Sequence, residues 1–158
     1  MAIVGSKEQL FAQVNSTCAA RIRRIASGYE ADPALRHELV QDIMLAIWVA
    51  LSNYRGDASL KTFAAAIAYN RCITHVARRA REARQVELPA DLVSAAPAPD
   101  EIVLRADEMR RLTASIQKLP VPQREAIVLC FEGFSYAESA TILGISTNAV
   151  MLRCQRAK

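Results

Sequence analysis

Apolar residues recur every three or four positions along most of this 158-residue chain, a spacing that predicts amphipathic helices. In the first half the pattern predicts three helices, over residues 7–27, 33–51 and 59–84. In the second half it predicts four helices, over residues 101–119, 122–133, 135–143 and 146–157. Alternating runs of β-branched residues, which are typical of strands, are scarce. We therefore expect an all-α protein.

The last two predicted helices are joined by a short glycine turn. Ser135 begins a capping-box sequence, Gly144 suits the left-handed position that ends a helix, and Ser146 or Thr147 can cap the next helix. Two helices and a tight turn in about 20 residues, here Tyr136 to Gln155, are typical of the helix-turn-helix motif, whose second helix usually enters a DNA major groove. An ordinary helical hairpin is the alternative interpretation.

Charge divides the chain into two basic blocks and an acidic connector. Residues 1–84 carry a net charge of +5, residues 85–108 of −5 and residues 109–158 of +4. Three prolines among small residues disfavour a helix in the connector. We expect two small helical domains, residues 1–84 and 101–158, joined by a flexible linker over residues 85–100. Because no large interface between them is evident in the sequence, we expect their relative placement to be adjustable.

The helix predicted over residues 59–84 carries a basic stripe. Arg71, His75 and Arg78 fall on one side of it, and further arginines extend the positive end. The core face predicted for this helix consists of Phe63, Ala66, Ile67, Asn70, Ile73 and Ala77. A solvated surface is the alternative interpretation, but five arginines accompany a single acid, Glu82, so intrahelical pairing is limited. The stripe therefore favours contact with nucleic-acid phosphates.

Other classes of protein find little support in the sequence. No apolar run approaches the roughly 20 residues of a membrane span, and the first residues do not resemble a signal peptide, so we expect a cytoplasmic chain without membrane insertion. The four cysteines form no CxxC pair and no histidine lies at ligand spacing, which favours structural thiols over a metal site. We expect neither a metal nor another cofactor.

These segments together resemble one known family, the extracytoplasmic-function (ECF) sigma factors of the sigma-70 class. Residues Glu38–Trp48 and Phe63–Arg79 are similar to two segments of the family's conserved region two. Residues Leu119–Glu125 and Glu132–Ser146 are similar to its region four. The resemblance extends from about Lys7 to Lys158, with the segments in the family's order and at its separations.

The resemblance implies a subunit that binds core RNA polymerase, directs it to promoters and has no catalytic role of its own. On the polymerase's largest subunit, the clamp helices would be bound by Glu38, Gln41, Asp42, Leu45 and Trp48. The minus-ten region of the promoter would be contacted by Tyr54, Arg55, Asp57, Asn70, Arg71, His75, Arg78 and Arg79. The minus-thirty-five element would be read by Ser146, Thr147, Asn148, Met151, Arg153 and Arg156.

The family also implies control by an anti-sigma factor, commonly as part of a bacterial stress response. Met151 and Leu152 depart from the family pattern, because polar DNA-facing residues are usual at these two positions. Here the departure suits either contacts with thymine methyl groups or an interface with an inhibitor protein. Val150 and Cys154 are the expected core positions of this last helix, which leaves Arg153 among the residues available for phosphates.

Two other functions fit parts of the sequence. A stand-alone helix-turn-helix transcriptional regulator would need a signal-receiving first domain, which the basic stripe does not resemble. A nucleic-acid-processing enzyme would need clustered carboxylates to hold metal ions. Glu38 and Asp42 share a helix face, but no third carboxylate is placed to join them.

Overall fold

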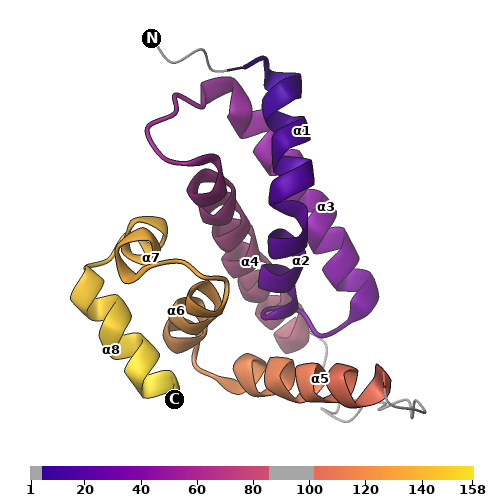
Figure 1. Cartoon of the computed structure of the whole chain (residues 1–158). Coiled ribbons are helices and arrows are strands. Elements are labelled where there is room, and N and C mark those ends of the chain that lie inside the picture. Colours follow the sequence, from indigo (N-terminus) through magenta and orange to yellow (C-terminus); the bar gives the residue numbers. More distant parts are fainter. Residues whose placement is uncertain (1–4, 86–101) are drawn as a thin grey trace.

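The structure, a computed structural model, describes residues 5–85 and 102–158, which are all-α (Figure 1). The first half contains α1 (Lys7–Thr17), α2 (Ala19–Ser27), α3 (Pro33–Ala50), the short 3-10 helix η1 (Leu51–Asn53) and α4 (Leu60–Gln85). The second half contains α5 (Ile102–Lys118), α6 (Val121–Phe131), α7 (Tyr136–Leu143) and α8 (Thr147–Ala157). Nearly all of the predicted linker lies outside the described residues.

Local capping rules set the ends of several helices. Asp32 accepts the backbone N–H groups of the first turn of α3, and Pro33 occupies a position at the helix start that needs no N–H donor. The capping box predicted at Ser135 is present at the start of α7. Gly144 ends α7 with φ of +67°, and the Ser146 hydroxyl caps α8. The helix-turn-helix geometry predicted from these residues is therefore confirmed.

One predicted helix is divided in two. The continuous helix expected over residues 7–27 is interrupted at Cys18, which separates α1 from α2. The hydroxyls of Ser16 and Thr17 both donate to the carbonyl oxygen of Gln13, at 3.1 and 2.7 Å. Such back-bonding competes with the helical hydrogen bonds and bends the chain, which accounts for the break.

The buried face of α4 also differs from the prediction. Asn70 and Ala77, both expected in the core, are exposed. The buried residues of α4 are Thr62, Ala64, Ala65, Ala68, Cys72 and His75. Because α4 carries apolar residues on more than one side, their spacing could not show which side the neighbouring helices cover. The buried alanines Ala64, Ala65 and Ala68 belong to the same core cluster as residues of α2 and α3.

The two halves share one hydrophobic core. Val128, Leu129 and Phe134 from the second half are buried in the same cluster as Ile22 and Ile25 from the first. Figure 1 shows α6 and α7 beside α4, and α4 and α7 are in contact. The halves are therefore packed together, through an interface that was not predicted from the sequence.

Close approach at the interface depends on one glycine. A Cβ atom added to Gly28, at the end of α2, would lie 2.9 Å from Cγ2 of Val128. That distance is shorter than van der Waals contact, so a larger residue at position 28 would push α6 away. Behind this interface, a smaller core of Ala126, Ala140, Val150 and Cys154 holds the helix-turn-helix together.

Candidate nucleic-acid interface

The outer face of α3 is exposed and partly apolar. Leu39, Ile43 and Ile47 hold α3 in the core. The opposite face consists of Glu38, Gln41, Asp42, Leu45 and Val49, all exposed. Leu45 and Val49 are each 61% exposed, and large apolar side chains at a helix surface indicate a partner. Val49 was not predicted, although it follows Leu45 by four residues, the spacing of a shared helix face.

Trp48 braces α3 against α1. Its ring meets Phe11 edge-on, with centroids 5.2 Å apart, and the Lys7 ammonium lies 4.3 Å from the ring centroid. An aromatic pair of this geometry adds roughly 1 kcal/mol beyond the area that it buries. The contacts show that Trp48 supports the exposed face of α3 from behind.

The loop between η1 and α4 is held by an aromatic anchor. The Tyr54 hydroxyl donates to the carbonyl oxygen of Ala58 at 2.6 Å, and its ring lies 4.8 Å from the ring of Phe63. Arg55 and Asp57 are exposed at the tip of the loop, on either side of Gly56. Gly56 has φ of +80°, a conformation that glycine adopts without strain. Tyr54 is engaged within the fold, whereas the two charged side chains point outward.

The exposed side of α4 combines polar and basic residues. Asn70, Arg71, Thr74, Arg78 and Arg79 are all exposed there. Arg71 lies 3.8 Å from Asp42 of α3, so the structure brings together one predicted polymerase contact and one predicted DNA contact. Both side chains are about half exposed, and an ion pair of this kind contributes little to stability.

His75 does not lie on the exposed stripe, which corrects the prediction that placed it beside Arg71 and Arg78. The residue is only 5% exposed, and its Nε2 is 2.6 Å from Oε2 of Glu30. The prediction failed because the helix turns position 75 toward the corner between α2 and α3. In this structure the His75 ring contacts protein on both of its nitrogen atoms.

The second helix of the helix-turn-helix presents a mixed surface. Ser146, Thr147, Asn148 and Arg156 are exposed, as is Leu152, while Met151 is partly buried. The predicted core positions of α8, Val150 and Cys154, are both buried. The N-terminal residues of α8, which enter the groove first in this motif, are therefore polar, with apolar side chains one turn further along.

Arg153 is not free for phosphates, contrary to the prediction. Its Nη1 donates to Oε2 of Glu125 on α6 at 3.2 Å, and the Glu125 side chain is 9% exposed. Burial raises the pKa of the Glu125 carboxyl, and the neighbouring Tyr69 hydroxyl and Arg153 guanidinium oppose this change. Removing Arg153 would leave the Glu125 carboxyl buried without its ion-pair partner, which explains the place of Arg153 on the inner side of α8.

A clasp joins the halves, formed by Glu132, Gly133 and Phe134 of the α6–α7 loop. Arg24 of α2 donates through Nε to both carboxylate oxygens of Glu132, each at 3.0 Å. The ring of Phe134 lies between Arg21 and Lys61, with their charged groups 5.5 and 4.4 Å from its centroid. The hydrogen bond to Glu132 raises the pKa of Arg24. The clasp therefore covers basic side chains of the first half with an acid and an aromatic ring.

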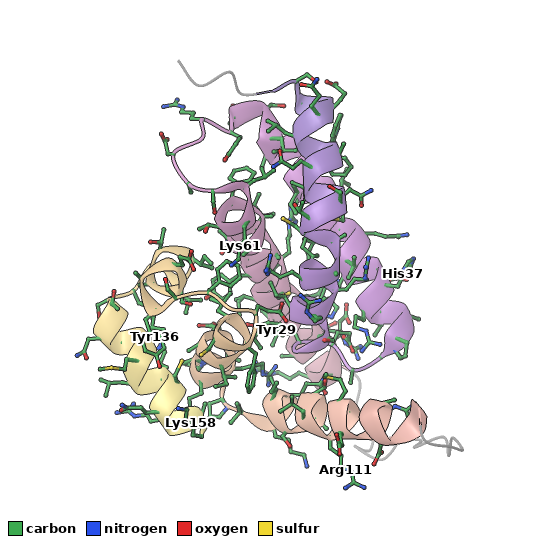
Figure 2. The ribbon with its side chains drawn as sticks, in the orientation of Figure 1. Tyr29, His37, Lys61, Arg111, Tyr136 and Lys158 are labelled. Carbon is green, nitrogen blue, oxygen red and sulfur yellow. The ribbon has the colours of Figure 1, made fainter. Side chains whose placement is uncertain are left out.

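Further contacts close the junction beside the clasp. Gln117 donates to the carbonyl oxygen of Ser27 at 2.9 Å. The guanidinium carbon of Arg124 lies 5.9 Å from the centroid of the Tyr29 ring, and Figure 2 shows Tyr29 between the two halves. A hollow of about 260 Å³ remains there, lined by Tyr29, Glu30, Ala31, Val76, Arg79, Gln117 and Arg124.

Metal and membrane sites find no support in residues 5–85 and 102–158. No group of three His, Cys, Asp or Glu side chains in this part of the chain could hold a metal ion. Among the helices described, none is both long and apolar enough to span a bilayer. The exposed features are instead a partly apolar helix face, a basic helix face and a helix-turn-helix, which together define a DNA-binding protein with an additional protein-docking surface.

Comparison with known families identifies the class more closely. Residues 16–82 match the model for Sigma-70 region 2, and residues 109–158 match the model for Sigma-70, region 4. The sequence is 30% identical over 132 residues to the RNA polymerase sigma factor CnrH of Cupriavidus metallidurans, covering 77% of this chain and 68% of that protein. It is also 30% identical over 141 residues to the ECF RNA polymerase sigma factor SigM of Mycobacterium tuberculosis, covering 87% of this chain and 66% of that protein. The chain belongs to the sigma-70 family and is a sigma factor of the ECF type.

Solved structures share the fold. CnrH in complex with the cytosolic domain of CnrY aligns with a TM-score of 0.67 at 23% identity, over 93% of this chain and 81% of that one. The sigma factor RpoE of Bartonella quintana in complex with the anti-sigma factor NepR aligns with a TM-score of 0.73 at 23% identity, over 93% and 91%. The family resemblance inferred from the sequence is confirmed.

Proposed function

We propose that this sigma factor binds core RNA polymerase through α3 and directs it to promoters through α4 and α8. The observation that carries the proposal is the adjacency of two different exposed faces in one folded unit. The partly apolar face of α3 lies beside the basic face of α4, and Asp42 and Arg71 mark the boundary between them. A protein partner on α3 would therefore place DNA directly along α4.

Polymerase docking accounts for the exposed apolar residues of α3. Leu45 and Val49 lie in water at a cost of roughly 25 cal/mol for each Å² of apolar surface. The clamp helices of the polymerase's largest subunit are the proposed partner, with Glu38, Gln41 and Asp42 as the polar part of the contact. The reaction itself belongs to the polymerase, and we assign no catalytic residue and no cofactor to this chain. Its place of action is the cytoplasm.

The loop between η1 and α4 is the proposed contact with the minus-ten element. Capturing an unstacked base costs a few kcal/mol, which a pocket and backbone contacts must offset. Arg55 and Asp57 are exposed at the loop tip, and Tyr54 holds the loop in place. Along α4, Asn70, Arg71, Arg78 and Arg79 supply the polar and basic contacts to the adjacent backbone.

Helix α8 is the proposed reader of the minus-thirty-five element. Ser146, Thr147 and Asn148 stand at the helix N-terminus, and Met151 and Leu152 follow one turn later. Apolar side chains at those two positions suit the C5-methyl groups of thymines in the major groove. Arg156 remains for a phosphate, while Arg153 supports the domain through Glu125.

The packed halves must separate on a promoter. The centres of the minus-ten and minus-thirty-five elements lie about 25 base pairs apart, which corresponds to roughly 85 Å of B-DNA at 3.4 Å per base pair. A compact chain of this length has a radius of gyration of about 15 Å. One packed molecule therefore cannot reach both elements, and promoter binding requires the clasp to open.

An anti-sigma factor is the proposed regulator. The two solved structures described above each contain a sigma factor with a second protein, CnrY or NepR. We propose an inhibitor that covers α3, α8 or both and so favours the packed state of the chain. The exposed Leu45, Val49 and Leu152 supply apolar area for such an interface.

A gel-shift comparison separates a sigma factor from a stand-alone regulator. The full chain is titrated against fragments of host DNA with and without core polymerase. A sigma factor shifts specific fragments only when core polymerase is present, because the free chain is packed and its α3 face is empty. Specific shifts by the chain alone would instead support a repressor or activator.

A further inference from the structure

Glu30 is a buried acid in the corner between α2 and α3. It is 6% exposed and uses both of its carboxylate oxygens. Oε1 accepts the backbone N–H of Asp32 at 3.0 Å. Oε2 lies 2.6 Å from Nε2 of His75 and 3.4 Å from Nε of Arg79. One side chain therefore joins the start of α3 to the basic end of α4.

His75 extends this contact to the neighbouring arginine. Its Nε2 faces a carboxylate and donates to it, whereas its Nδ1 faces the guanidinium of Arg78, which can only donate, so Nδ1 is the acceptor. Nη2 of Arg78 lies 3.3 Å from that Nδ1. Both nitrogens of the ring are thus used, one toward Glu30 and one toward Arg78.

Stability alone gives a weak reason for this arrangement. Taking charged groups out of water is costly, and apolar residues of similar size often replace a buried ion pair without loss of stability. The network does fix the directions in which two arginine side chains point. Arg78 and Arg79 are neighbours in sequence, so their side chains leave the helix about 100° apart. Arg78 is held from His75 and Arg79 from Glu30, so two guanidinium groups are fixed at the exposed surface of α4.

We propose that Glu30 and His75 are positioning residues that set the direction of Arg78 and Arg79 toward the promoter backbone. The proposal rests on the proposed function, in which these arginines contact phosphates. Through Asp32, whose side chain caps α3, Glu30 also ties the start of the polymerase-docking helix to this DNA-binding surface. Neither Glu30 nor His75 touches the nucleic acid.

The decisive variant is Glu30→Gln, because electrostatics and positioning predict opposite results. Removing a negative charge near DNA should raise affinity or leave it unchanged. The glutamine amide has only one accepting oxygen. It therefore cannot accept the backbone N–H of Asp32 and at the same time bind His75 and Arg79. Positioning therefore predicts weaker promoter binding, with the salt slope lowered by about one unit for each arginine that no longer reaches a phosphate.

Glu82→Gln is the matched control. Glu82 is exposed and lies 4.0 Å from the same Arg79, on the outer side of α4. This variant makes the same change of charge but leaves the buried network intact. Holoenzyme made with each full-length variant and host core polymerase is titrated with a labelled duplex from a start site mapped by run-off transcription, across a series of salt concentrations. We expect Glu82→Gln to match the natural protein.

His75→Gln gives an independent test should Glu30→Gln fail to fold. The glutamine amide can still donate to Glu30 near the position of Nε2, but it offers no acceptor at the position of Nδ1. The salt slope should fall by about one unit, and adding Arg78→Ala should cause no further loss, since the two changes remove the same contact.

Equal salt slopes for Glu30→Gln and Glu82→Gln, or an unchanged slope for His75→Gln, would overturn the positioning role. Failure of the proposed function looks different. In that case the double variant Arg78→Ala and Arg79→Ala would itself leave promoter affinity and the salt slope unaltered.

Discussion

The clasp between the two halves can be weakened by one conservative substitution, Glu132→Gln. The Glu132 side chain is 9% exposed and lies against Arg24 and Arg21, whose side chains are 56% and 23% exposed. The amide keeps the shape of the carboxylate but loses its charge and one of its two accepting oxygens. Both arginines then face a neutral group across the interface, so separation of the halves becomes less costly.

The size of the effect follows from the contacts. Hydrogen bonds to charged groups contribute about 1.5–3 kcal/mol when shielded from water. The exposure of Arg24 reduces this value toward that of a surface pair. We therefore expect a loss of about 1–2 kcal/mol in the free energy that holds the halves together, which corresponds to a change of about 5- to 30-fold in the ratio of packed to open molecules.

Native-state hydrogen exchange measures this ratio even when open molecules are rare. The backbone N–H of Phe134, in the clasp, is bonded to the carbonyl oxygen of Leu129 at 3.1 Å, and the Phe134 side chain is only 4% exposed. If this amide exchanges through opening of the interface, its rate rises in proportion to the open fraction. Exchange in the peptide that contains Phe134 should be about 5- to 30-fold faster in Glu132→Gln.

Asp107→Asn is the control, because Asp107 pairs with Arg111 at 3.0 Å within α5 and spans no interface. In the Asp107→Asn variant, hydrogen exchange in the peptide that contains Phe134 should equal that in the natural protein. Unchanged exchange in Glu132→Gln, or equal acceleration in both variants, would refute the reasoning that Glu132 holds the halves together.

Four further substitutions or measurements test other parts of the account. Replacing Gln41 and Asp42 by Ala should weaken binding to core polymerase in a pull-down or anisotropy titration, with little change in stability because both side chains are exposed; unchanged affinity would exclude them from the docking face. Arg71→Ala should lower the salt slope of promoter binding by about one unit, and an unaltered slope would make Arg71 only a surface residue. Ser135→Ala should lower the free energy of unfolding by about 1 kcal/mol through loss of the α7 capping box, measured by urea denaturation. Burial raises the pKa of Cys72 to about 12 from an ordinary value of 9.0, so the thiol should resist iodoacetamide at pH 8 in the folded chain. Its contribution to stability is complete below pH 9 and is lost as the pH rises toward 12; rapid native labelling would contradict the burial.

Features set by local rules were predictable from the sequence. The capping box at Ser135 and the left-handed Gly144 depend on neighbouring residues and on backbone geometry alone, and both occur where predicted. For α3 the family resemblance, rather than the periodicity, pointed to Gln41, Asp42 and Leu45, and all three are exposed.

Features set by tertiary contacts were not predictable in the same way. His75 has the spacing of a stripe with Arg71 and Arg78, but its environment is decided by Glu30, which lies 45 positions earlier in the chain. Arg153 is likewise turned inward by a buried acid on another helix. A charged side chain shows its role only when its partner is known, and single-sequence periodicity does not identify partners.

Run-off transcription tests the central claim most directly. Purified chain and host core polymerase are combined on the host's genomic DNA, and the transcripts are compared with those of core polymerase alone and of the chain alone. The account predicts a small set of discrete new start sites that require both components and share spaced minus-ten and minus-thirty-five elements. A transcript pattern identical to that of core polymerase alone would contradict it.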